Sequence, residues 1–244
     1  QTCALPILPL LREGFERLLD ASALLRKPPR RRQLAVSVAP SFAAKWLMPR
    51  MDGFHREHPD VEVWISADME VADLASGAVD VAVRYGPGGY PNLLSERLLS
   101  ETVLPVCSPE LAARIRRPRD LADHTLLHDL SVDRDPSCPD WAMWLKARGV
   151  TGVDPRRGPR FNQSALVIEA AVMGRGVGLA KRTLAQADLA AGRLVAPFAD
   201  GSTAIDFAYH VVQPRNRPPS AGAVAFVSWL KQEAVAHENS MDQL

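Results

Sequence analysis

Residues 34–66 place the strongest limit on how this 244-residue chain can fold. A short apolar strand predicted over 34–38 meets a Pro-Ser turn, and an amphipathic helix predicted over 42–57 follows it. A His-Pro-Asp turn at 58–60 ends this helix, and a second apolar strand is predicted over 61–66. Strand, polar turn, helix and strand form a βαβ unit, whose turn directs backbone N–H groups above the edge of the sheet.

The alternation of strands and helices continues through the rest of the chain and predicts an α/β fold. Five prolines fall in the connections between the predicted elements and agree with those breaks: Pro118, Pro136, Pro139, Pro155 and Pro159. We predict further strands over 79–85, 103–107, 125–128, 160–162, 177–180 and 206–212, and helices over 71–76, 109–114, 140–148, 164–174, 182–191 and 221–237.

The composition is that of an ordinary soluble protein, with 47% hydrophobic and 23% charged residues. The net charge of +1 gives no general attraction to nucleic acid. No apolar run is long enough to cross a bilayer, and we find no signal peptide, so we predict a cytoplasmic protein without membrane contact. The three cysteines cannot all pair with one another, which favours reduced thiols.

Residues 1–7 fit poorly with the rest of the chain. A common sequencing-adaptor end translates to the same seven residues. We interpret them as an artefactual tail, and a genuine short tail is the alternative. Under the first interpretation, native sequence before Leu8 is missing.

A heptad stripe comes directly after this tail and predicts a helix that needs a partner, because so short a helix is marginal in water on its own. The partner could be this chain's own domain or a second copy. A basic stretch at 26–32 ends the helix as a hinge; it could contact DNA phosphates, although a solvated linker is more usual. The stripe consists of Leu8, Leu11, Phe15, Leu18, Ser22 and Leu25.

Several motifs, in order, resemble the effector-binding domain of LysR-type transcriptional regulators, in particular the glycine-cleavage-activator-like branch. The resemblance runs from about Leu8 to Lys231. The motifs are Trp-Leu-Met-Pro-Arg-Met at 46–51, the Asp-Leu to Arg-Tyr-Gly segment at 73–86, and the segments at 104–109, 141–145, 170–179 and 192–198.

The resemblance implies a two-lobed fold like that of type 2 periplasmic binding proteins, preceded by a dimerisation helix. It implies that residues 8–32 are the linker helix and hinge that pair with a second subunit. The first lobe would comprise 33–104 plus 210–237, the second lobe 105–209, and 238–244 a C-terminal tail. A small effector would bind in the cleft between the lobes.

Polar residues at the start of two predicted helices are candidates for this cleft. Ser41 and Phe42 open the first helix, where a hydroxyl and free N–H groups suit an anion, or where Ser41 only caps its own helix for about 1 kcal/mol. Asn162, Gln163 and Ser164 stand at the matching place on the second lobe and could close over the ligand or act as caps.

Strand ends supply the remaining candidates. Ser66 and Asp68 would line the first lobe, where Asp68 could pair with an amine on the ligand or cap the next turn. Arg84, with Tyr85 beside it, could meet an acidic group of the effector or pair with Asp80 or Asp68. Cys107, at a predicted lobe crossing, could sense redox state, although a small buried hydrophobe is the favoured interpretation.

Two patterns that imitate functional motifs are assigned structural roles. The three glycines at 174–178 resemble a dinucleotide fingerprint but follow a helix and precede a strand, so they are predicted to end the helix and allow close packing. The histidine pairs at 55/58 and 124/128 lack a third ligand of clear geometry, so no metal site is predicted.

We therefore predict the effector-binding and oligomerisation part of a LysR-type regulator, without cofactor or catalysis. Its expected partners are a small polar or anionic effector, further copies of itself in a dimer or tetramer, and promoter DNA through a missing N-terminal helix-turn-helix. The alternative is the solute-binding protein of a transporter, which shares the fold. An enzyme is disfavoured because no nucleophile–base or metal constellation is present.

Overall fold

The computed structural model describes residues 14, 15, 17, 33–68, 74, 78–133 and 135–241. Its strands form one eight-stranded sheet in the order β2-β1-β3-β8-β4-β7-β5-β6. The strands are β1 (Gln33–Val38), β2 (Glu62–Ala67), β3 (Val81–Gly86), β4 (Leu93–Val106), β5 (Leu126–Asp129), β6 (Arg160–Phe161), β7 (Val177–Lys181) and β8 (Thr203–Pro214).

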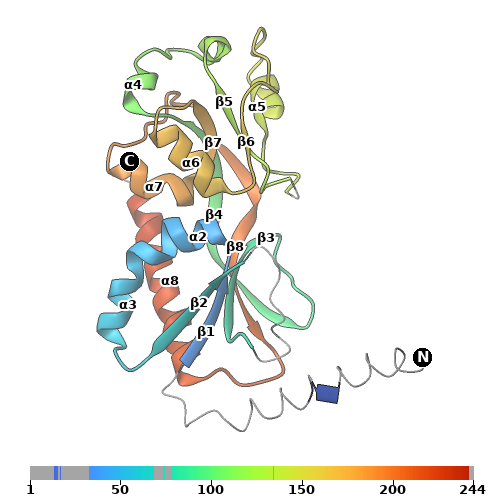
Figure 1. Ribbon diagram of the computed structural model, residues 1–244, viewed down its shortest axis with the longest axis vertical. Helices are drawn as coiled ribbons and strands as arrows, with labels where there is room; N and C mark the ends of the chain where they lie inside the picture. Colours follow the sequence, from blue (N-terminus) through green and yellow to red (C-terminus); the bar gives the residue numbers. More distant parts are fainter. Residues whose placement is uncertain are drawn as a thin grey trace, which may run out of the picture.

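Two lobes lie one above the other along the long axis of the molecule (Figure 1), and the two long strands β4 and β8 run through both. In the first lobe β2, β1 and β3 are parallel, and β3 pairs antiparallel with the later part of β8. In the second lobe β7 pairs antiparallel with the end of β4 and parallel with β5. The two-lobed α/β prediction is confirmed, while the exact lobe boundaries stay a prediction.

Helices cover the sheet in both lobes, and the longest, α8, runs along the first lobe and reaches the level of α7 (Figure 1). None of the helices in the described part of the chain is long and apolar enough to cross a membrane. The helices are α2 (Pro40–Phe42), α3 (Met51–Glu57), α4 (Pro109–Ala112), α5 (Trp141–Ala147), α6 (Ser164–Val172), α7 (Arg182–Ala190) and α8 (Ala221–Met241), with the π-helix η1 (Ala43–Leu47) and the 3-10 helices η2 (Met48–Arg50) and η3 (Pro118–Asp123).

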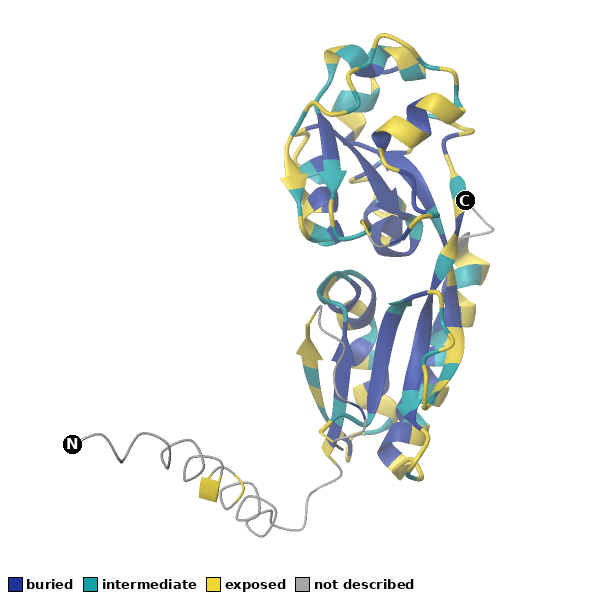
Figure 2. Cartoon of the chain, turned by 90° about the vertical axis from the view of Figure 1, so that its right-hand side faces the viewer, coloured by how far each residue is buried: buried dark blue, intermediate teal, exposed yellow. Residues whose placement is uncertain are grey.

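Aromatic side chains anchor the core of each lobe, and the buried residues lie along the strands and inner helix faces of both (Figure 2). In the first lobe Phe54 meets Phe226 edge to face, with ring centroids 5.2 Å apart. In the second lobe Trp141 and Trp144 lie 5.6 Å apart. Each of these two indole N–H groups donates to a backbone carbonyl, so their burial leaves no unmet donor.

The prediction of one continuous helix over 42–57 is wrong. The structure begins the helical segment at Pro40 and divides it into α2, η1, η2 and α3. Pro49 has no N–H to donate to the preceding turn, and the backbone widens so that the Met48 amide donates to the carbonyl of Ala43.

The strand predicted over 103–107 was too short, because β4 is 14 residues long and begins at Leu93. Residues 93–102 read Leu-Leu-Ser-Glu-Arg-Leu-Leu-Ser-Glu-Thr, and register shifts at 97–99 and 99–101 break the two-residue period that would have indicated a strand. The short helix η3 was also missed. The helix predicted over 71–76 lies outside the described residues except for Leu74, which is buried.

The glycines of the dinucleotide-like motif end a helix, as predicted. Gly174 follows Met173, the C-cap residue of α6, with φ of 67°, and its N–H donates to the carbonyl of Ala171. A side chain at Gly176 would place its Cβ 2.4 Å from the carbonyl oxygen of Thr125, so this position needs the close backbone approach that glycine permits.

Candidate functional site

A cavity of about 360 Å³ lies between the two lobes. Ser41, Asp68 and Arg84 line it from the first lobe, and Ser131, Ser164 and Lys181 line it from the second. The aromatic rings of Phe42, Tyr85, Phe207 and Tyr209 form much of the remaining wall. Its volume is in the range of small-molecule sites, and its mixture of apolar walls and a few polar groups is typical of them.

The parallel strands explain why these side chains converge. Asp68 follows β2, Tyr85 lies at the end of β3, Ser131 follows β5 and Lys181 ends β7. Ligands in open α/β sheets bind outside the carboxyl ends of the strands, since loops and helix starts meet there. The cavity therefore occupies the position that the topology of both lobes favours.

Lys181 is the most informative residue of this cavity, and it is absent from the residues predicted from sequence. Its side chain is buried, and its ammonium lies 3.2 Å from the hydroxyl of Ser164 and 4.2 Å from the centre of the Tyr85 ring. Among the described residues no carboxylate forms an ion pair with it. The carboxylate of Asp129 reaches this ammonium only through the hydroxyl of Ser164, so an anion in the cavity would be its first direct ion-pair partner among the described residues.

A hydroxyl network holds the second-lobe wall in place. Ser164 donates to a carboxylate oxygen of Asp129 at 2.5 Å, and Ser131 donates to the other oxygen at 2.6 Å. The two serine hydroxyls are themselves 3.1 Å apart. Asp129 thus fixes both serine hydroxyls, Ser164 accepts from Lys181, and the oxygens of Asp129 are already occupied.

Tyr85 joins the two lobes across the cavity. Its hydroxyl donates to Asp135, whose second oxygen accepts from the Ser137 amide, the Ser137 hydroxyl and the Cys138 amide. Burial, followed by the bond to Asp135, raises the pKa of the Tyr85 hydroxyl far above its ordinary value, so it remains a donor. Asp135 is therefore satisfied by the protein itself.

Arg84 lies on the first-lobe wall and is held by its own lobe. Its guanidinium donates to the hydroxyl of Ser37 at 2.6 Å and to the carbonyl of Val83 at 3.3 Å. Burial lowers its pKa, and the nearby Tyr90 and Asp68 oppose that shift. Among the alternatives predicted for Arg84, the pairing with Asp80 is wrong, because Asp80 bonds Arg217 at 3.1 Å and the amide of Ala35 at 2.9 Å.

The structure brings six of the ten predicted effector-site residues together. Ser41, Phe42, Asp68, Arg84, Tyr85 and Ser164 line the cavity, whereas Ser66, Cys107, Asn162 and Gln163 do not. Ser66 lies beside the cavity and donates to Asp68 at 2.5 Å. Gln163 is the N-cap residue of α6, but its side chain makes no capping bond.

Ser41 does not cap its own helix, which corrects the simpler of its two predicted roles. The N-cap position of α2 is Ala39, and Ser41 lies inside the first turn after Pro40. Its hydroxyl oxygen instead accepts a hydrogen bond from the amide of Ala165 in the second lobe, at 3.0 Å. Ser41 thus caps the N-terminus of α6.

Cys107 is a buried core residue outside the cavity. Burial raises the pKa of its thiol to about 11, so at neutral pH the reactive thiolate is scarce. This agrees with the interpretation as a small buried hydrophobe.

Of the predicted dimerisation residues, only Phe15 lies in the described part of the chain, and it is 65% exposed. The other four, Leu8, Leu11, Leu18 and Leu25, lie outside the described residues, as does Ser22. The pairing of this helix with a second copy stays a prediction.

Comparison with known proteins decides the family. The model of the LysR substrate binding domain matches residues 27–235. The chain belongs to the LysR family. It is 37% identical over 231 residues to the glycine cleavage system transcriptional activator of Escherichia coli K12, covering 93% of this chain and 73% of that protein. It is 33% identical over 227 residues to the transcriptional activator AmpR of Rhodobacter capsulatus, covering 92% of this chain and 74% of the relative.

Solved structures agree with the sequence relatives. The effector domain of AmpR from Pseudomonas aeruginosa superimposes with a TM-score of 0.71 at 29% identity, covering 86% of this chain and 99% of that domain. This LysR-family chain is thus the effector-binding part of a transcriptional regulator. The alternative, a solute-binding protein of a transporter, is wrong, since these sequence relatives are regulators.

Proposed function

We propose that this regulator senses a small organic anion in the cavity between its lobes, and that Lys181 holds the anionic group. The observation that supports this most strongly is the buried ammonium of Lys181, which has no ion pair among the described residues. The Lys181 ammonium has three N–H donors and uses one on the hydroxyl of Ser164, so a carboxylate or phosphate oxygen beside it can accept a charge-assisted hydrogen bond from another.

The rest of the ligand would contact mostly apolar surface. Phe42 and Tyr209 pack with ring centroids 4.7 Å apart, and Tyr85 and Phe207 lie 5.6 Å apart. All four rings line the cavity. A compact carbon skeleton suits these walls, and an amine on it would find Asp68 on the first lobe.

A thermal-shift screen tests this function. We would measure the melting temperature of the chain against a panel of small carboxylates, amino acids and phosphate esters, in the wild type, Lys181→Met and Lys231→Met. Lys231 is the matched control, because it forms a surface ion pair with Glu96 at 2.6 Å, away from the cavity.

We expect at least one anion to stabilise the wild type and Lys231→Met but not Lys181→Met. A ligand at about 100 times its Kd stabilises a protein by about 2.7 kcal/mol, which is readily detected. Equal stabilisation of Lys181→Met by the same anion would contradict the assignment.

The remaining parts of the function concern assembly and place of action. We infer that the chain acts in the cytoplasm without catalysis, as a dimer or tetramer, and that promoter DNA is contacted by a helix-turn-helix domain outside this sequence. The names of several relatives, "HTH-type transcriptional activator" among them, support the DNA-binding role. Sedimentation of the chain with and without residues 8–25 tests the assembly, since a monomer in both cases would contradict it.

A further inference from the structure

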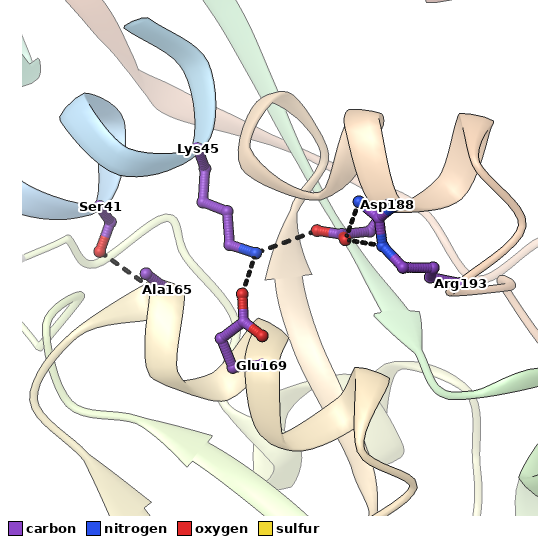
Figure 3. Close-up of polar contacts among 6 residues, drawn as sticks. All are labelled: Ser41, Lys45, Ala165, Glu169, Asp188 and Arg193. Atoms are coloured by element: carbon purple, nitrogen blue, oxygen red, sulfur yellow. Dashed lines mark hydrogen bonds and ion pairs between the residues drawn. The ribbon is translucent and has the colours of Figure 1, made fainter. Parts of the chain in front are cut away.

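Lys45 connects the two lobes outside the cavity (Figure 3). Its ammonium lies 2.5 Å from a carboxylate oxygen of Glu169 on α6 and 3.1 Å from one of Asp188 on α7. The Lys45 side chain is only 13% exposed, so these contacts are partly shielded from water and salt. Lys45 does not line the interlobe cavity.

A second contact crosses between the lobes one helical turn away. The Ser41 hydroxyl accepts from the amide of Ala165, in the first turn of α6 (Figure 3). The residue that should cap this helix, Gln163, makes no side-chain capping bond. The first lobe therefore satisfies an amide that α6 cannot satisfy by itself.

The local backbone explains why both contacts come from one segment. Ser41 belongs to α2, and Lys45 belongs to the π-helical turn η1 that follows directly. A π-helical turn is rare and occurs often at functional sites. Here it carries the only lysine of the segment toward two acidic side chains on different helices of the opposite lobe.

Helix α6 links these contacts to the cavity. It begins with Ser164, which lines the cavity and lies 3.2 Å from the ammonium of Lys181, and it carries Glu169 further along. Any movement of α6 away from the first lobe would move Ser164 and open the cavity. The contacts of Ser41 and Lys45 resist that movement.

The charges allow this connection to break without a large penalty. Asp188 is 5% exposed but also bonds Arg193 of its own lobe at 2.8 Å, so it keeps a partner when Lys45 leaves. Glu169 is 49% exposed and can be hydrated. A contact of this kind suits a state that must open to admit a ligand.

We propose that Ser41 and Lys45 are positioning residues of an interlobe clamp, formed with Ala165, Glu169 and Asp188, that holds the cavity closed before any effector binds. The clamp sets the fraction of molecules whose lobes are closed, the state in which both lobes line the cavity, and hence the apparent affinity for the effector. Its relation to the effector rests on the proposed function, but the clamp itself is tested without a ligand.

The test is amide hydrogen exchange of the full chain, followed by NMR at Ala165. In Lys45→Met we expect exchange at Ala165 to be faster by about tenfold or more, because the lobes open more often, while amides of β7 in the second-lobe core keep wild-type protection. Lys45→Arg should restore protection. Lys231→Met, which removes an ion pair within the first lobe, should leave Ala165 unchanged.

Glu169→Gln provides a second variant at an exposed position that is safe for folding, and should give an intermediate acceleration. Unchanged exchange at Ala165 in both Lys45→Met and Glu169→Gln overturns the clamp. Equal acceleration in Lys231→Met, or joint loss of protection at Ala165 and β7, also overturns it, since either shows general destabilisation. If hydrogen exchange supports the clamp but no anion binds at Lys181, only the proposed ligand class is refuted.

Discussion

The hydroxyl of Ser41 in the first lobe accepts a hydrogen bond from the backbone amide of Ala165 in the second, at 3.0 Å. The two residues are 124 positions apart in the chain. A helix start normally finds its cap within its own sequence, so a cap supplied from the opposite lobe couples the N-terminus of α6 to lobe closure. Ser41 also lines the cavity, which places this coupling beside the ligand.

Ser41→Ala should separate closure from general stability. We expect it to lower the free energy of unfolding by about 1 kcal/mol, as other cap removals do, and also to reduce the thermal shift produced by any anion that stabilises the wild type. Ser220→Ala is the matched control, because Ser220 caps α8 within one lobe through the Ala223 amide at 3.1 Å. An equal loss of ligand response in both variants would show that Ser41 is only a cap.

Glu101 should make stability depend on pH. Its carboxyl lies on β4, is 3% exposed, and burial raises its pKa to about 7 against an ordinary value of 4.5, although amides of Thr183 and Thr102 and the charge of Lys181 act in the opposite direction. The folded chain keeps this proton to higher pH than the unfolded chain. The stabilisation is therefore complete below pH 4.5 and is lost as the pH rises toward 7.

Glu101→Gln stays neutral at all pH values and should avoid this loss. We expect the stability of Glu101→Gln relative to the wild type to increase by an amount on the order of 3 kcal/mol between acidic and mildly basic pH. Urea denaturation at several pH values measures the difference, with Glu96→Gln on the exposed part of the same strand as control. A difference that does not vary with pH would contradict the burial argument.

Much of the fold follows from local pattern. The apolar strands at 34–38 and 177–180, and the turn signals between them and their helices, are short-range features that one sequence displays. The early part of β4 was missed because register shifts interrupt its two-residue period, and the division at η1 was missed because a π-helical turn has no simple hydrophobic period. Both features depend on contacts with segments far away in the chain, β8 for β4 and the helices of the second lobe for η1.

The site was less predictable for the same reason. Helix starts and strand ends correctly pointed to Ser41, Asp68, Arg84 and Ser164 as residues near one cavity. Lys181 carried a readable signal, a lysine that ends an apolar strand, but its burial and its lack of an ion pair appear only in three dimensions. The acceptor role of Ser41 toward Ala165 has no local signature.

Trp144 should contribute strongly to the stability of the second lobe through one hydrogen bond. Its indole N–H donates to the carbonyl of Gly201 at 2.9 Å, and Trp144→Phe would leave this carbonyl without that donor. We expect a loss of about 1–3 kcal/mol in the free energy of unfolding, measured by urea titration. Trp64→Phe is the control at a site 71% exposed and should change stability by less than about 0.5 kcal/mol. Equal effects would mean that the indole bond is unimportant.

Lys181 is proposed to bind the anion, but it should not stabilise the fold when no ligand is present. Its ammonium is buried with a hydroxyl and an aromatic face as neighbours, and among the described residues it has no ion pair. Lys181→Met keeps most of the side-chain volume and removes the buried charge, so without ligand the variant should be at least as stable as the wild type. Urea denaturation in a buffer free of small carboxylates and phosphate measures this. A loss of more than about 1 kcal/mol in the free energy of unfolding would show that Lys181 stabilises the fold and is not kept for anion binding.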